Sequence, residues 1–185
     1  MKKFQIGIMG SAADLNYSKE ALACAKKLGQ LIAQSGHILV YGAEKAYSSL
    51  STNAAIAASK NGGITVGITY GKDKNIYGDF CPTVLIPCGL ELGGGREYTL
   101  ILACDIIIAI GGGSGTLTEM AIAYQANIPI ITINKYPGWA KKLSNKYIDK
   151  RHRLKCLGVN TPEEALNLAL KILQERSDKN ENSKC

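Results

Sequence analysis

Residues 105–116 read DIIIAIGGGSGT, and this stretch decides the fold of the 185-residue chain. After the initial aspartate, residues 106–110 are apolar without alternation. Such a run is typical of a central strand in a parallel sheet whose two faces are both covered by helices. The glycines that follow allow a tight loop, and the sequence after Gly115 suits a helix. The stretch therefore predicts a buried strand, a glycine loop and a helix in direct succession.

Short β-branched runs and longer amphipathic stretches alternate over the rest of the chain. We expect strands at residues 4–9, 37–41, 64–69, 83–86, 105–110, 129–133 and 154–157, and helices at 18–36, 49–60, 95–104, 115–126, 139–147 and from Thr161 onward. This alternation predicts an α/β fold, Rossmann-like, with three αβα layers and a mainly parallel sheet. We expect one domain over residues 1–176 and a disordered polar tail over residues 177–185.

Composition narrows the class of protein. With 46% hydrophobic and 20% charged residues, the chain is an ordinary globular one. Its six cysteines are scattered, with no C-x-x-C pair and no short-spaced His/Cys cluster, which argues against a zinc site and a disulfide framework. No stretch approaches the ~20 apolar residues that span a bilayer. We therefore expect a cytoplasmic protein that uses no membrane, no metal and no cofactor.

The positive charge is concentrated in one segment. The net charge is +7, and eight basic side chains lie between Lys135 and Lys155, around Trp139, Tyr147 and His152. A basic segment with aromatic residues can bind nucleic acid. We favour the other interpretation, a solvated face or the basic rim of a site for an anionic ligand.

The glycine loop predicts an anion site. Its glycines let the backbone approach a ligand, and the N-terminus of the following helix presents free N–H groups and a partial positive charge. Parallel sheets bind ligands beyond the carboxyl ends of their strands, where the strand order reverses. The loop after the first strand, residues 10–14, fits the same place. The residues predicted to bind a phosphate or nucleotide are Gly112, Gly113, Ser114, Gly115, Thr116, Gly10 and Ser11.

Two common nucleotide motifs are absent. A G-x-G-x-x-G motif that starts at Gly113 needs glycine at position 118, where Thr118 stands. The pattern G-x-x-x-x-G-K-[ST] does not occur either. The sequence therefore predicts neither a standard dinucleotide site nor a P-loop NTPase.

Residues 111–119, GGGSGTLTE, are similar to the P-G-G-x-G-T-x-x-E signature of the Lonely Guy (LOG) family. Arg96 matches the arginine of that family's E-R-K element. The resemblance runs from Phe4 to about Gln174, and the molybdenum-cofactor carrier proteins are close relatives. It implies a homodimer that hydrolyses nucleoside 5′-monophosphates to a free base and ribose 5-phosphate. It also implies that Arg96 and Glu119 are catalytic.

The implied chemistry gives each residue a role. Glu119 follows the loop by one helical turn, so its carboxylate lies beside the sugar and stabilises an oxocarbenium-like transition state. Arg96 holds the phosphate, or orients the base and the glutamate. The chain departs from the family pattern in three places: Gly111 replaces the usual proline, Gly94 and Gly95 replace the usual residues before Arg96, and residues 41–47, YGAEKAY, keep one glycine where the family has several. The last departure favours an alternative. The alternative is a non-catalytic binder of a nucleotide, the molybdenum cofactor or an oxyanion.

Overall fold

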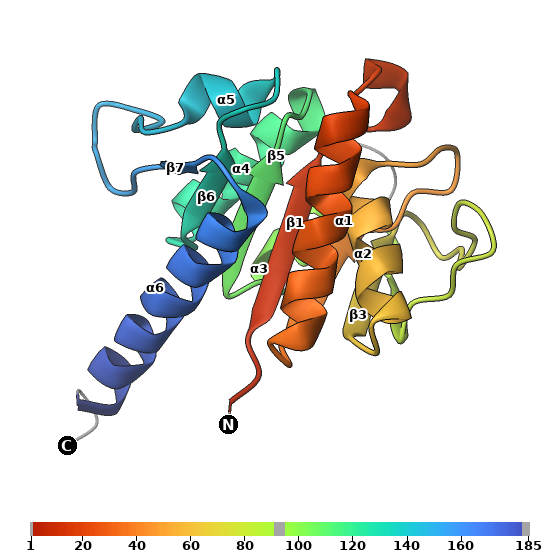
Figure 1. Ribbon diagram of the computed structural model, residues 1–185, viewed down its shortest axis with the longest axis horizontal. Helices are drawn as coiled ribbons and strands as arrows, with labels where there is room; N and C mark the ends of the chain where they lie inside the picture. Colours follow the sequence, from red (N-terminus) through yellow and green to blue (C-terminus); the bar gives the residue numbers. More distant parts are fainter. Residues whose placement is uncertain (1, 91–94, 183–185) are drawn as a thin grey trace.

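The computed structural model of the chain describes residues 2–90 and 95–182. Its strands are β1 (Gln5–Gly10), β2 (Ile38–Gly42), β3 (Ile64–Thr69), β4 (Val84–Pro87), β5 (Ile106–Ile110), β6 (Ile130–Ile133) and β7 (Leu157–Val159). They form one seven-stranded sheet in the order β4-β3-β2-β1-β5-β6-β7, and each neighbouring pair is parallel. The predicted α/β, Rossmann-like fold is therefore confirmed (Figure 1).

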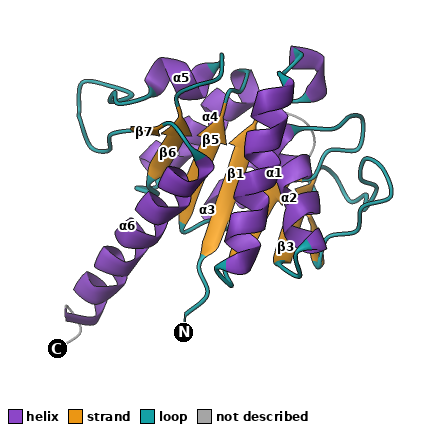
Figure 2. Ribbon diagram, viewed as in Figure 1, coloured by secondary structure: helices purple, strands orange, loops and turns teal. Residues whose placement is uncertain are grey.

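Helices cover both faces of this sheet (Figure 2). They are α1 (Lys19–Gln34), α2 (Leu50–Lys60), α3 (Arg96–Leu102), α4 (Ser114–Gln125), α5 (Trp139–Leu143) and α6 (Pro162–Asn182), with a short 3-10 turn η1 (Ala13–Leu15). One core packs α1, α2 and α6 against the sheet, and the other packs α3, α4 and α5. Ile108 of β5 belongs to the first core and Ile107 to the second. Burial on both faces explains why residues 106–110 show no alternation.

The sheet order reverses between β1 and β5, as the sequence predicts. β1 pairs with β2 on one side and with β5 on the other. The loops that follow β1 and β5 consequently meet. Ser11 N donates to Ile110 O at 3.3 Å, and Gly112 N donates to Ser11 Oγ at 2.7 Å. This is the edge at which sheets of this type bind ligands.

The elements after β6 differ from the prediction. The helix expected over residues 139–147 ends at Leu143, and the strand expected at 154–157 forms instead at Leu157–Val159. The reason is a hairpin-like loop between them. Asn145 has a left-handed φ of 59°, its N–H donates to Cys156 O at 2.9 Å, and Cys156 N donates to Lys146 O at 2.9 Å.

The last helix is longer than predicted. Residues 177–182, expected to be disordered, continue α6. The side chain of Gln174 donates to Asp178 one turn later at 2.8 Å, and Arg176 reaches Asn127 O at 2.8 Å. These contacts anchor a segment that has little apolar periodicity. The remaining part of the expected tail, residues 183–185, lies outside the described residues.

Candidate functional site

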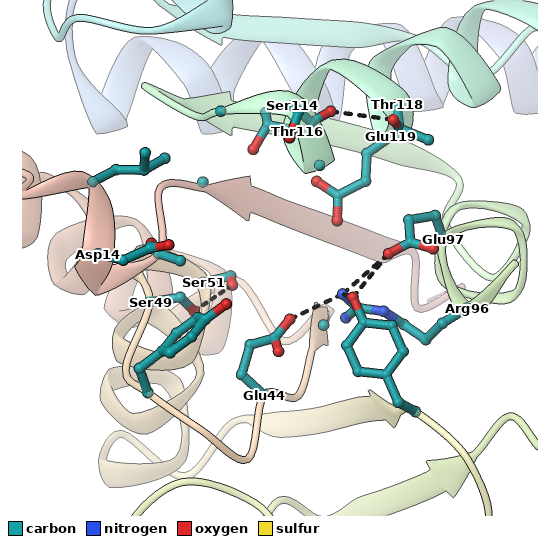
Figure 3. Close-up of a pocket in the computed structure, with 18 of the residues that line it drawn as sticks. Asp14, Glu44, Ser49, Ser51, Arg96, Glu97, Ser114, Thr116, Thr118 and Glu119 are labelled. Carbon is teal, nitrogen blue, oxygen red and sulfur yellow. Dashed lines mark hydrogen bonds and ion pairs between the residues drawn. The ribbon is translucent and has the colours of Figure 1, made fainter. Parts of the chain in front are cut away.

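A cavity of about 540 Å³ opens at the carboxyl ends of β1 and β2, between α3 and the start of α4 (Figure 3). Most of the predicted site residues line it: Gly10, Arg96, Gly113, Ser114, Gly115, Thr116 and Glu119. Ser11 and Gly112 are not among the lining residues. They hydrogen-bond to each other behind the loop, where the Ser11 hydroxyl accepts the Gly112 N–H. The volume is in the usual range for a small-molecule site.

The N-terminus of α4 forms one end of the cavity. Within the described chain, the first backbone N–H of this helix with a carbonyl partner is that of Leu117, which donates to Gly113 O at 3.1 Å. The N–H groups of Ser114, Gly115 and Thr116 precede it and are free to bind a ligand. A Cβ built on Gly115 meets no atom within 4 Å, so this position borders open space. The arrangement is that of an anion-binding helix end.

The backbone of the glycine loop explains its departure from the LOG signature. Gly111 has a φ of +63°, a value that proline cannot adopt because its ring fixes φ near −65°. Gly112 has a φ of +92°, and a Cβ there would overlap the side chain of Thr116. The two glycines therefore shape the loop, while Gly113 and Gly115 border the cavity.

Arg96 forms the other end of the cavity, at the first position of α3. The residue is 4% exposed. Its Nη2 donates to Glu44 Oε1 at 3.0 Å, to the Tyr70 hydroxyl at 2.5 Å and to Glu97 Oε1 at 3.4 Å (Figure 3). Its guanidinium also lies 4.2 Å from the centre of the Tyr70 ring. Nη1 and Nε are buried and have no partner among the described residues.

Glu119 projects from α4 into the cavity (Figure 3). The residue is 8% exposed. Burial raises the pKa of its carboxyl to about 8, although the nearby Arg96 acts in the opposite direction. Because desolvation disfavours the ionised form, the group is mostly protonated at neutral pH. A protonated carboxyl both donates and accepts hydrogen bonds.

Sequence reasoning missed several polar residues of the site. Asp14, Glu44, Tyr70 and Glu97 all line the cavity. Together with Glu119 they place four carboxyl groups in the cavity, and in the described lining Arg96 is the only basic residue. Two signals were available. Residues 10–14, which include Asp14, were placed at this edge of the sheet, and the missing glycines after β2 were visible in the sequence, although the partner of Glu44 was not.

The described residues offer no obvious metal site. Within residues 2–90 and 95–182, His, Cys, Asp and Glu side chains form no group of three that could hold a metal ion. Over the same residues, no helix combines the length and apolar character required to cross a membrane.

Known sequences resemble this chain over most of its length. The sequence pattern of the SLOG cluster4 family matches residues 3–166. An uncharacterized protein of Archaeoglobus fulgidus is 32% identical over 125 residues, which represent 68% of this chain and 76% of that protein.

Solved structures share the fold. The molybdenum cofactor binding protein from the phototrophic bacterium Rippkaea orientalis superposes with a TM-score of 0.77 at 28% identity, covering 94% of this chain and 99% of its own. The molybdenum cofactor carrier protein of Chlamydomonas reinhardtii gives 0.74 at 24% identity, with the same coverage. A structural genomics X-ray structure gives 0.80 at 24% identity, covering 92% and 99%.

Proposed function

We propose that this chain, which belongs to the SLOG cluster4 family, is a binding protein for a small molecule that carries one phosphate group. The observation that carries the proposal is the first turn of α4, whose free N–H groups border a cavity of about 540 Å³. The phosphate binds these N–H groups and the Thr116 hydroxyl. The rest of the ligand extends toward Arg96 and Glu119.

The charges in the cavity favour a binder over a hydrolase. Hydrolysis of a nucleoside monophosphate develops positive charge on the ribose, and in the role assigned to Glu119 an ionised carboxylate stabilises that charge. The pKa of Glu119 is raised to about 8 by burial, so its negative charge is largely absent at neutral pH. Arg96 is already paired with Glu44. The LOG-type hydrolase therefore remains the second hypothesis, supported by the position of Glu119 one turn after the loop.

Two ligand classes fit this proposal. One is a nucleoside monophosphate. The other is the molybdenum cofactor, since a structural relative at 28% identity is described as binding it and its organic part ends in a phosphate. The described lining contains no thiol or imidazole, so in this case the protein would hold the organic part and leave the metal without a protein ligand of that kind.

Titration calorimetry with a panel of probes tests the proposal. The probes are inorganic phosphate, AMP and GMP, and each mixture is then analysed by chromatography for released base. We expect saturable binding of at least one monophosphate and no released base. Base release by the wild type that is lost in Glu119→Gln would establish the hydrolase instead. Failure to bind any of the phosphate probes would contradict the binding proposal.

We also propose that the chain forms a homodimer through α3. Tyr98 and Leu102 are 60% and 62% exposed, and their spacing of four residues places them on one face of the helix. Tyr98 also lines the cavity, so a second subunit on this face would border the ligand site. Sedimentation at micromolar concentration should give a dimer, and Leu102→Glu should give a monomer. A monomeric wild type would rule out this assembly.

A further inference from the structure

Arg96 is a buried cation that the proposed phosphate site does not use. Its side chain is 5% exposed and lines the same cavity as the N-terminus of α4. A buried guanidinium of this kind is a strong site for an anion, because it forms charge-assisted hydrogen bonds in a weakly polar environment. In this chain, the anion that meets its Nη2 is part of the protein, while Nη1 and Nε have no partner among the described residues.

That anion is Glu44. Its Oε1 lies 3.0 Å from Arg96 Nη2, and its side chain is 19% exposed. The backbone on either side of it is fixed by the fold: Ala43 N donates to Ile68 O at 2.9 Å, and Tyr77 N donates to Glu44 O at 2.8 Å. The carboxylate is therefore held against the guanidinium by the loop after β2.

Gly42 lets the pair form. A Cβ built on Gly42 would overlap Arg96 Nη1. Gly42, the last residue of β2, therefore makes room for the arginine, and Glu44, two residues later in the loop that follows, neutralises it. A second negative group, Glu97, lies 3.4 Å from the same guanidinium. An incoming phosphate has to displace or approach these carboxylates, and like charges at such distances repel strongly.

We propose that Glu44 is a specificity residue that reserves Arg96 and so restricts the cavity to ligands with one anionic group. The end of the ligand that faces Arg96 is uncharged and carries N–H or O–H donors, which suit the surrounding carboxylates. Ligands with a second phosphate are excluded. This inference rests on the proposed function in one respect, since it takes the N-terminus of α4 as the site of the first anion.

The test compares the wild type with Glu44→Gln, which keeps the size of the side chain and removes its charge. Titration calorimetry with inorganic phosphate should show one additional bound phosphate in Glu44→Gln. Adenosine 3′,5′-bisphosphate should bind the wild type at least tenfold more weakly than AMP, and this preference should disappear in Glu44→Gln.

Two further variants serve as controls. Asp14→Asn removes a carboxylate that lines the same cavity but forms no ion pair with Arg96, so the preference for AMP should remain. In the double variant Glu44→Gln/Arg96→Gln, the additional phosphate should be lost. Thermal unfolding of each variant checks that it is folded, and Glu44→Ala provides a second way to remove the charge.

The outcomes separate this inference from the proposed function. If the wild type binds no phosphate and Glu44→Gln binds one, the proposed phosphate site at α4 is contradicted and the proposed role of Glu44 is supported. Equal phosphate stoichiometry in the wild type, Glu44→Gln and Glu44→Ala would overturn the role of Glu44. An AMP preference that survives both substitutions would overturn it as well.

Discussion

The loop after β5 and the loop after β2 lie at the same edge of the sheet but present opposite charge: the first is followed by free N–H groups, and the second carries a carboxylate. Residues 111–116 keep their glycines and leave the first N–H groups of α4 without a backbone acceptor among residues 2–90 and 95–182. β2 ends at Gly42, and the loop that follows has no further glycine in residues 43–47 but contains Glu44, which pairs with Arg96. One end of the cavity thus presents free N–H groups, where we propose that an external anion binds, and at the other end Glu44 pairs with Arg96 Nη2. This difference would fix the orientation of a bound ligand, with its phosphate at α4 and its uncharged end at Arg96.

The largest expected effect tests the end of the cavity where Glu44 pairs with Arg96. Arg96→Ala removes the cation that Glu44 and Glu97 share. It should lower the free energy of unfolding by about 3–5 kcal/mol, because two largely buried carboxylates lose their partner. Urea denaturation measures this change. Arg151→Ala is the control, since its ion pair with Asp149 is solvent-exposed and such pairs contribute little to stability. Equal effects of the two substitutions would show that Arg96 has no special structural role.

The second-largest expected effect tests the N-terminus of α4, where we propose that the phosphate binds. Gly115 lies in the first turn of α4 with open space around the position of its missing Cβ. Gly115→Val should weaken the binding of phosphate or AMP about 100-fold, because the side chain covers the N–H groups that bind the anion. Stability should change by less than about 1 kcal/mol, within the range of helix propensity.

The matched control for Gly115→Val is Gln125→Val, at the exposed C-terminal end of the same helix. It introduces the same side chain far from the cavity, so ligand affinity should be unchanged. Calorimetric titration with AMP measures both variants. If Gly115→Val binds AMP as tightly as the control, the anion does not sit at this helix end.

The two loops also differ in how far sequence predicts them. The proposed anion site at residues 111–116 is local: a buried strand, a run of glycines and a helix start follow one another in the chain, and each constrains the next. The ion pair of Glu44 with Arg96 joins residues 52 positions apart. No periodicity or short motif predicts such a contact, because it forms only when the fold brings β2 and α3 together.

The same distinction explains the errors in the fold. The central strands could be predicted because they are apolar throughout, whereas residues 144–156 are polar and their loop depends on the contact between Asn145 and Cys156. Ser11 is a further example. It lies next to the predicted ligand loop, but its hydroxyl accepts the Gly112 N–H and braces that loop from behind.

The smallest expected effect concerns Glu119, which lies between the two ends. Burial raises the pKa of this carboxyl from 4.5 to about 8 in the folded protein. Between these two pH values the unfolded chain is ionised while the folded chain keeps the proton, so folding binds a proton and stability falls as the pH rises. Above pH 8 both forms are ionised and the decline ends.

Glu119→Gln should therefore be more stable than the wild type at pH 8 by about 2 kcal/mol, with the difference nearly gone at pH 5. Linkage gives roughly 1.4 kcal/mol for each unit by which the pKa in the folded protein exceeds that in the unfolded chain, and water entering the neighbouring cavity reduces this difference. Urea denaturation at the two pH values measures the difference, and the groups common to both proteins cancel. Equal pH dependence in the two proteins would show that Glu119 is ionised at neutral pH. That result would restore the charge that the hydrolase hypothesis needs and weaken the argument for a non-catalytic binder.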